Sequence, residues 1–247
     1  MSDFDRNVAA RGSFADRAAA VDAGLRAYML RVYNYMAAAV ALSGVVAWLT
    51  YNAAVTSAGT LTPFGQTVFG GPMMIVLLLA TLGLVFFISF RIDRLQFGTA
   101  LTLFMVYAGL LGVTLAPIFL IYTGASVTRV FFISAASFGA LSLYGYTTQR
   151  DLSPIGSFLI MGLFGVILAS LVNIFLKSSG LEFAISVIGV GVFAGLTAWD
   201  TQRIKEMYDP MEDGTIVGRK AVMGALTLYL DFINLFLFML RLFGDRR

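Results

Sequence analysis

The chain has 247 residues, of which 59% are hydrophobic, and its mean hydropathy is +0.85. Soluble domains have about 45 to 50% apolar residues, and the surplus here comes in runs long enough to span a bilayer. The composition therefore predicts an all-α, polytopic membrane bundle. The chain has no Cys and no His, which excludes disulfides, thiolate or imidazole metal sites and Ser-His catalysis. The net charge of +3 forms no continuous basic patch, so no nucleic-acid partner is expected.

Residues 1–26 are polar, and their arginines lie among alanines without a compact apolar core, so they predict no cleaved signal peptide. This segment is either a surface amphipathic helix or a solvated cytoplasmic tail, and we favour the tail. The predicted organisation is a tail at 1–26 and a transmembrane domain at 27–247.

Seven apolar segments follow, each long enough to cross the hydrocarbon core as a helix. They are residues 27–51, 73–90, 97–122, 127–148, 155–176, 181–204 and 221–243. Four of the five prolines fall between these segments, whereas Pro117 lies inside the third and predicts a kink there. Glycines such as Gly189, Gly191 and Gly195 predict close helix packing. Their spacing does not fit a dinucleotide-binding loop, and no cofactor is expected.

Charged loops alternate with uncharged ones, which by the positive-inside rule places the N-terminus and the loop between the sixth and seventh spans in the cytoplasm. Arg246 and Arg247 do not follow the positive-inside rule, because seven crossings put them outside the cytoplasm. The alternative is that the last segment re-enters the membrane, but its length favours seven crossings. The absence of retention motifs and glycosylation sequons is typical of a bacterial inner membrane protein.

Two acidic residues, Asp200 and Asp231, interrupt apolar segments on consecutive predicted helices. Each costs about 2.5 to 3.5 kcal/mol at a bilayer centre, which predicts that antiparallel packing brings them together. Two carboxyl groups in such a place share one proton, because both cannot ionise cheaply. Losing the proton creates like-charge repulsion that separates the helices unless a cation enters. Oxygen ligands suit Ca²⁺, with Asn234 and Thr201 as further candidate ligands.

Each of these residues has a simpler interpretation. Asp200 could be a helix-end carboxylate paired with Arg203 one turn away, whereas Asp231 lies about ten residues from either end of its span and favours function. Arg91 is a candidate third member of the site, where it would neutralise the two carboxylates, although an anchor at the cytoplasmic interface is the stronger interpretation.

Three stretches of the sequence are distinctive: residues 228–236 (LYLDFINLF) followed by 240–244 (LRLFG), residues 142–153 (SLYGYTTQRDLS), and residues 200–204 (DTQRI). The first resembles the C-terminal signature of the Bax inhibitor family, and the other two resemble two further segments of that family. The similarity covers nearly the whole membrane region. It implies seven helices with the last surrounded by the others, and a diaspartyl pH sensor at Asp200 and Asp231 with an arginine on the second helix, for which Arg91 is the nearest candidate.

Relatives in that family are described as pH-sensitive calcium leak channels; eukaryotic ones suppress cell death, and a bacterial one restrains a membrane protease. The leading hypothesis is thus a pH-gated cation leak, with calcium as the expected ion. The alternative is a membrane-embedded regulator of a membrane protease or of a stress or cell-death pathway, without transport. An intramembrane aspartyl protease is the third hypothesis, but the residues before the aspartates, Trp199 and Leu230, do not resemble such enzymes. No enzymatic activity is expected.

Overall fold

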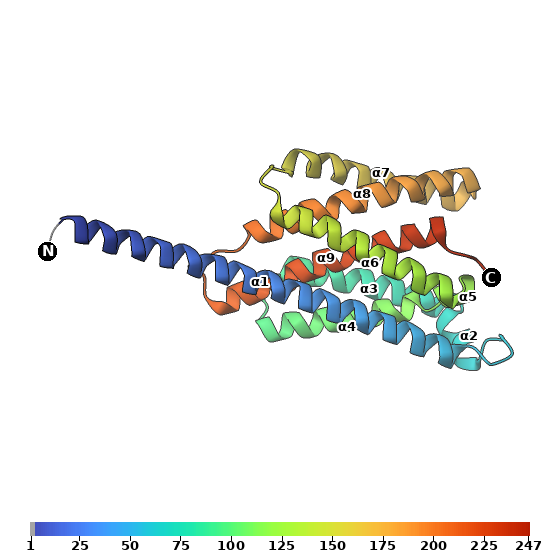
Figure 1. Cartoon of the computed structure of the whole chain (residues 1–247). Helices are drawn as coiled ribbons and strands as arrows, with labels where there is room; N and C mark the ends of the chain where they lie inside the picture. Colours follow the sequence, from blue (N-terminus) through green and yellow to red (C-terminus); the bar gives the residue numbers. More distant parts are fainter. Residues whose placement is uncertain (1–2) are drawn as a thin grey trace.

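A computed structural model describes the backbone of residues 3–247 and the side chains of residues 21–247. Within this range the regular secondary structure is helical, apart from two isolated β-bridges. Figure 1 shows the long helices lying side by side along one direction. The elements are α1 (Asp3–Ala54), α2 (Pro63–Phe69), α3 (Gly71–Arg91), the 3₁₀ turn η1 (Ile92–Arg94), α4 (Phe97–Leu115), α5 (Ile118–Ile121), α6 (Gly124–Thr147), α7 (Ser153–Leu176), α8 (Ser179–Glu206) and α9 (Gly214–Phe243).

The prediction of seven spans is confirmed: the described residues contain seven helices that are long and apolar enough to cross a membrane. Most limits agree within a few residues. Among the later spans the largest difference is the start of α9, which begins at Gly214 rather than at residue 221, because Asp213 caps a polar first turn that hydropathy does not detect. At the other end of the chain, residue 27 is not a helix boundary, since α1 is continuous from Asp3 to Ala54. The solvated character of residues 1–26 stays a prediction.

The break predicted at Pro117 is present. α4 ends at Leu115, and the four-residue α5 completes the third span after a turn in which the Phe119 amide donates to the carbonyl of Ala116 at 3.2 Å. Proline cannot donate a backbone hydrogen bond within a helix, which explains the interruption. The short helix α2 was not predicted, and it begins where the Thr62 side chain accepts from the Gly65 amide.

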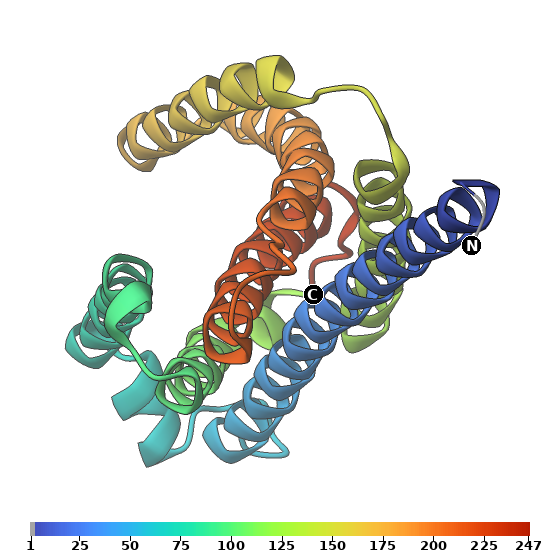
Figure 2. The same ribbon diagram turned by 90° about the vertical axis from the view of Figure 1, so that its left-hand side faces the viewer.

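α9 is the most buried span, with 72% of its apolar window enclosed by protein compared with 11% for the spans formed by α3 and α7. Figure 2 shows α9 between α1, α4, α6 and α8, the four long helices against which it packs. Its Tyr229 is fully buried, and its hydroxyl lies 2.6 Å from the Ser43 hydroxyl, which donates to the carbonyl of Ala108 on α4 at 2.8 Å. These two hydrogen bonds fix α9 against α1 and α4.

The helix α9 is unbroken from Gly214 to Phe243, about 45 Å at 1.5 Å per residue, so the re-entrant alternative does not describe it. Seven crossings put the loops after α3, α6 and α8 at one end of the bundle. We call this the inner end, because its basic residues place it in the cytoplasm; they include Arg91, Arg94, Arg150, Arg203, Lys205, Arg219 and Lys220. The opposite, outer end holds residues 244–247.

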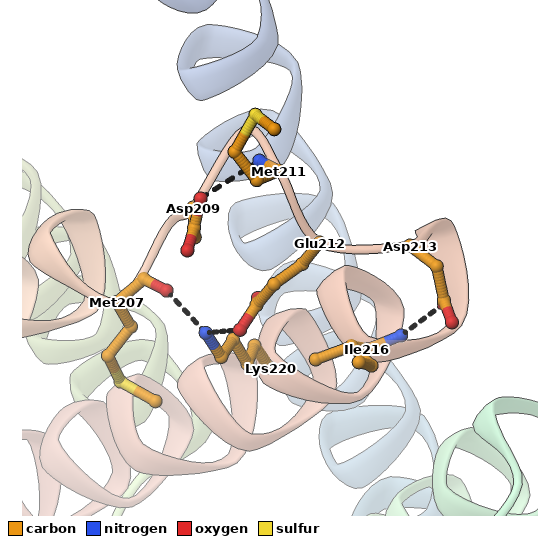
Figure 3. A network of polar contacts seen from close by, with 7 residues as sticks. All are labelled: Met207, Asp209, Met211, Glu212, Asp213, Ile216 and Lys220. Carbon is orange, nitrogen blue, oxygen red and sulfur yellow. Dashed lines mark hydrogen bonds and ion pairs between the residues drawn. The ribbon is translucent and has the colours of Figure 1, made fainter.

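At the inner end, the loop between α8 and α9 is held by polar contacts (Figure 3). The Lys220 ammonium donates to the Met207 carbonyl at 2.9 Å and to a Glu212 carboxylate oxygen at 2.6 Å. Asp213 accepts from the amides of Thr215 and Ile216, at 2.6 and 3.0 Å, and so caps α9. These contacts fix where α9 leaves the loop, and therefore the register at which it packs on α8.

We expect Asp213→Ala to lower the thermal unfolding temperature of the purified protein in micelles, and Asp213→Asn to retain most of it, because Asn is also a good cap. The amide of Ile216, and then that of Thr215, lower the pKa of Asp213. A lowered pKa stabilises the fold at neutral pH, and this contribution is lost as the pH falls through the folded-state pKa. The difference between Asp213→Ala and wild type should therefore shrink in acid. Equal unfolding temperatures for all three proteins would contradict the cap.

Candidate functional site: an intramembrane carboxyl pair

The site begins with the close packing of α8 on α9, which run antiparallel. A side chain at Gly224 would meet Ile204, and one at Gly189 would meet the Phe238 ring, so both glycines lie where the helices approach most closely. These two contacts fix a register in which residues near 200 on α8 face residues near 230 on α9. Gly189, which was predicted to allow close packing, and Gly224, which was not, thus place the acidic residues opposite one another.

Asp200 and Asp231 are 8% and 5% exposed. Their side chains lie within interaction distance of each other, and both line a cavity of about 600 Å³ between α7, α8 and α9. One carboxyl oxygen of Asp231, Oδ2, is buried and has no hydrogen-bond partner among the described residues. A buried polar atom without a partner costs about 1 to 3 kcal/mol, so the arrangement is poised to accept a proton or a cation.

One basic residue is found among the described residues that line this cavity, Arg203. It lies one turn from Asp200, and its guanidinium stacks over the Trp199 ring at 5.5 Å from the ring centre. Arg203 attracts the Asp200 carboxylate. The described residues contain no ion pair between Arg203 and Asp200, so the local pairing considered for Asp200 stays a prediction.

The other predicted site residues do not all lie at this cavity. Asn234 lines the same cavity, and its amide donates to the Leu230 carbonyl at 2.8 Å, one turn earlier on α9. Thr201 lies elsewhere: it is fully buried and hydrogen bonds to Thr197 and Ser142 at 2.7 and 2.9 Å. Arg91 is exposed at the end of α3, and the residues that line the cavity do not include it. The roles assigned to these residues stay predictions.

Sequence reasoning missed a second set of polar residues, which joins the inner end of α8 to residues 146–152. Gln202 accepts from the Leu152 amide at 2.9 Å and donates to the Arg150 carbonyl at 2.8 Å, and Lys205 donates to the Tyr146 carbonyl at 2.9 Å. The contacts of Gln202 join residues 200–204 to residues 142–153, two of the segments that carried the family resemblance, and Lys205 lies directly after the first of them. The available signal was Gln202 itself, a polar residue two positions from an intramembrane Asp.

The site fits a transient, largely hydrated cation better than a tightly held one. Ca²⁺ takes six to eight oxygen ligands, whereas the pair offers two carboxyl groups, with the Asn234 side chain beside them. Among residues 21–247, no group of three or more His, Cys, Asp and Glu side chains could hold a metal ion. A cation here would keep most of its water.

The fold and the site define a polytopic helical membrane protein with a buried carboxyl pair between its last two helices. The family model described as "Inhibitor of apoptosis-promoting Bax1" matches residues 25–247. The chain belongs to this family, the Bax inhibitor family.

Relatives in bacteria match almost the whole chain. Protein RP147 of Rickettsia prowazekii is 50% identical over 226 residues, which cover 92% of either chain. The inner membrane protein YbhL of Escherichia coli K12 is 48% identical over 227 residues, covering 91% of this chain and 94% of YbhL. A protein of Caulobacter vibrioides is 44% identical over 250 residues and covers all of either chain. The protein is thus a multi-pass protein of the bacterial inner membrane.

Proposed function

We propose that the protein is a pH-sensitive cation leak channel gated by Asp200 and Asp231, with Ca²⁺ as the expected ion. The observation that carries the proposal is that two buried carboxyl groups from adjacent helices line one cavity, and that Asp231 Oδ2 lacks a partner among the described residues. Ionisable groups inside a membrane bundle are costly and typical of ion pathways and proton relays.

The gate follows from the charge of the pair. With one proton shared, a hydrogen bond can join α8 to α9. When the proton leaves, two negative charges about 4 Å apart repel by about 4 kcal/mol at an effective dielectric constant of 20. Separation of the helices or entry of a cation relieves that repulsion, so a rise in pH is expected to open the pathway. Arg203 offsets part of the charge from the inner side.

No catalytic step is assigned to the pair. The alternative, a regulator of a membrane protease without transport, makes a different prediction: the protein would co-purify with a protease and would carry no flux. Ca²⁺ is therefore the ion proposed for the channel, and a membrane protease is the partner that the alternative predicts.

The test is flux through the purified wild-type protein in liposomes loaded with a Ca²⁺-sensitive dye. We expect Ca²⁺ entry that rises with pH when flux is measured in steps from about pH 5 to pH 8. Protein-free liposomes prepared in parallel give the background leak. Flux no greater than that background at every pH would exclude a channel and favour the regulator.

A further inference from the structure

Residues 245–247 form a strap across the outer end of the bundle. The Thr123 amide donates to the Asp245 carbonyl at 3.1 Å, and the Arg247 amide donates to the Ile121 carbonyl at 2.9 Å, so that Tyr122 and Arg246 form an antiparallel bridge. The strap thereby pairs with the turn between α5 and α6. Its position is fixed by backbone contacts as well as by its side chains.

Each strap side chain also contacts a different helix. Asp245 forms an ion pair with Arg129 of α6 at 2.7 Å, Arg246 with Glu182 of α8 at 3.0 Å, and Arg247 donates to the Tyr51 hydroxyl of α1 at 3.2 Å. These contacts explain how two arginines are held at the outer end, against the positive-inside trend. They also bring a guanidinium to the one acidic residue in the first turn of α8.

Glu182 and Arg246 lie at a second cavity, of about 610 Å³, between α5, α7, α8 and α9. This cavity adjoins the one that holds the carboxyl pair, because Ser170 and Ile174 line both. On α8, Glu182 and Asp200 are eighteen residues apart, about 27 Å. The two cavities therefore extend along α8 over nearly the thickness of a hydrocarbon core, about 30 Å.

The chemistry of the outer cavity suits a cation that is kept out by an internal competitor. Glu182 is the one carboxylate among the described residues that line it, and two guanidiniums, Arg241 and Arg246, line it as well. Arg241 stacks over the Phe238 ring at 5.4 Å from the ring centre, whereas Arg246 pairs with Glu182 and occupies the place a cation would take. Both side chains are half exposed, at 43% and 58%, and exposed ion pairs are weak and screened by salt. A divalent cation can therefore displace the guanidinium.

We propose that Glu182 is the outer cation-binding residue of the pathway and that Arg246 is a tethered counter-ion which must leave Glu182 before a cation binds. This deepens the proposed function and rests on it for the transport role, whereas the binding of a cation at Glu182 can be measured without transport.

Three single variants in the full-length protein test the proposal, with Ca²⁺ flux into liposomes as the readout. Arg246→Gln is expected to lower the half-saturating Ca²⁺ concentration by about two- to fivefold, the range for removing an exposed ionic competitor. Glu182→Gln is expected to remove saturation at low Ca²⁺, and adding Arg246→Gln to it should change nothing more. Arg129→Gln is the matched control, because it breaks the other exposed strap ion pair, and Arg129 does not line the cavity. If Arg129→Gln has the same effect as Arg246→Gln, loosening of the strap explains the result and the counter-ion does not.

A disulfide separates the charge of Arg246 from the position of the strap. Tyr122 and Arg246 are opposed without direct backbone hydrogen bonds, a pairing with Cα atoms about 4.5 Å apart, which a disulfide can bridge. The chain has no other cysteine. The oxidised Tyr122→Cys/Arg246→Cys variant should saturate at low Ca²⁺ like Arg246→Gln, with Tyr122→Cys alone as control. If low-Ca²⁺ saturation appeared only after reduction, strap movement would be the barrier and the proposal would be wrong.

Binding without flux distinguishes this proposal from the proposed function. A ligand that binds the folded state raises the unfolding temperature, so Ca²⁺ should stabilise Arg246→Gln in micelles more than wild type and Glu182→Gln less. This result in a protein that carries no flux would refute the channel and retain the site. Flux in wild type, with unchanged Ca²⁺ stabilisation in both variants, would refute the site and retain the channel.

Discussion

Asp231→Asn is expected to abolish the pH dependence of cation flux and to raise the stability of the protein. Asn has nearly the shape of Asp and is neutral at every pH, so deprotonation of the pair no longer creates repulsion. Its amide can also donate to the Asp200 carboxyl group, and Asp231 Oδ2 has no partner among the described residues in the wild type. Removing such an unsatisfied atom is worth about 1 to 3 kcal/mol. Liposome flux and thermal unfolding between about pH 5 and pH 8 measure the two effects.

Asp151→Asn is the matched control, because Asp151 is an exposed carboxylate in the loop between α6 and α7. It should leave the pH dependence of flux unchanged. Its effect on unfolding should be small, because Asn can also accept the hydrogen bond that Asp151 accepts from the Ser153 amide at 2.8 Å. The stability gained in Asp231→Asn should be largest at the upper end of the pH range, where the wild-type pair carries the most charge. Flux that keeps its wild-type pH dependence in Asp231→Asn would place the gate elsewhere in the bundle.

The membrane helices were predictable because apolar length is a strong signal that survives without tertiary information. All seven spans were placed, and Pro117 was correctly expected to interrupt the third. The first turns of α9 were missed, since Gly214, Arg219 and Lys220 look like loop residues when hydropathy alone is considered. Their helix depends on the Asp213 cap and on the Lys220 contacts, which are visible only in three dimensions.

The carboxyl pair was predictable for a related reason: the cost of a lone carboxylate in a membrane implies a partner. The directions in which the other side chains point were not predictable. Thr201 follows Asp200 directly, yet successive helix positions point about 100° apart, so it faces Ser142 on α6 rather than the cavity. Arg246 and Arg247 were recognised as exceptions to the charge rule, but their partners Glu182 and Tyr51 lie 64 and 196 residues away in sequence.

Gly145→Ala is expected to destabilise the protein by about 1 to 3 kcal/mol, the cost of overpacking a close contact. A Cβ at this position would overlap the backbone of Ala198, including its carbonyl oxygen, and a helix backbone cannot turn aside as a flexible side chain can. α8 must then move away from α6, which also strains the nearby hydrogen bond between Ser142 and Thr201, 2.9 Å in the wild type. Thermal unfolding in micelles measures the loss.

The control for this prediction lies on the same helix. A Cβ at Gly139 would have nothing within 4 Å, so Gly139→Ala should stabilise α6 by about 0.5 to 1 kcal/mol through reduced backbone entropy. Ala198 is only two residues from Asp200, and displacement of α8 by Gly145→Ala should therefore also change the pH dependence of flux, whereas Gly139→Ala should not. Equal stability changes in the two variants would show that α6 and α8 are not in backbone contact. The close packing of α6 on the segment of α8 that carries Asp200 would then have to be abandoned.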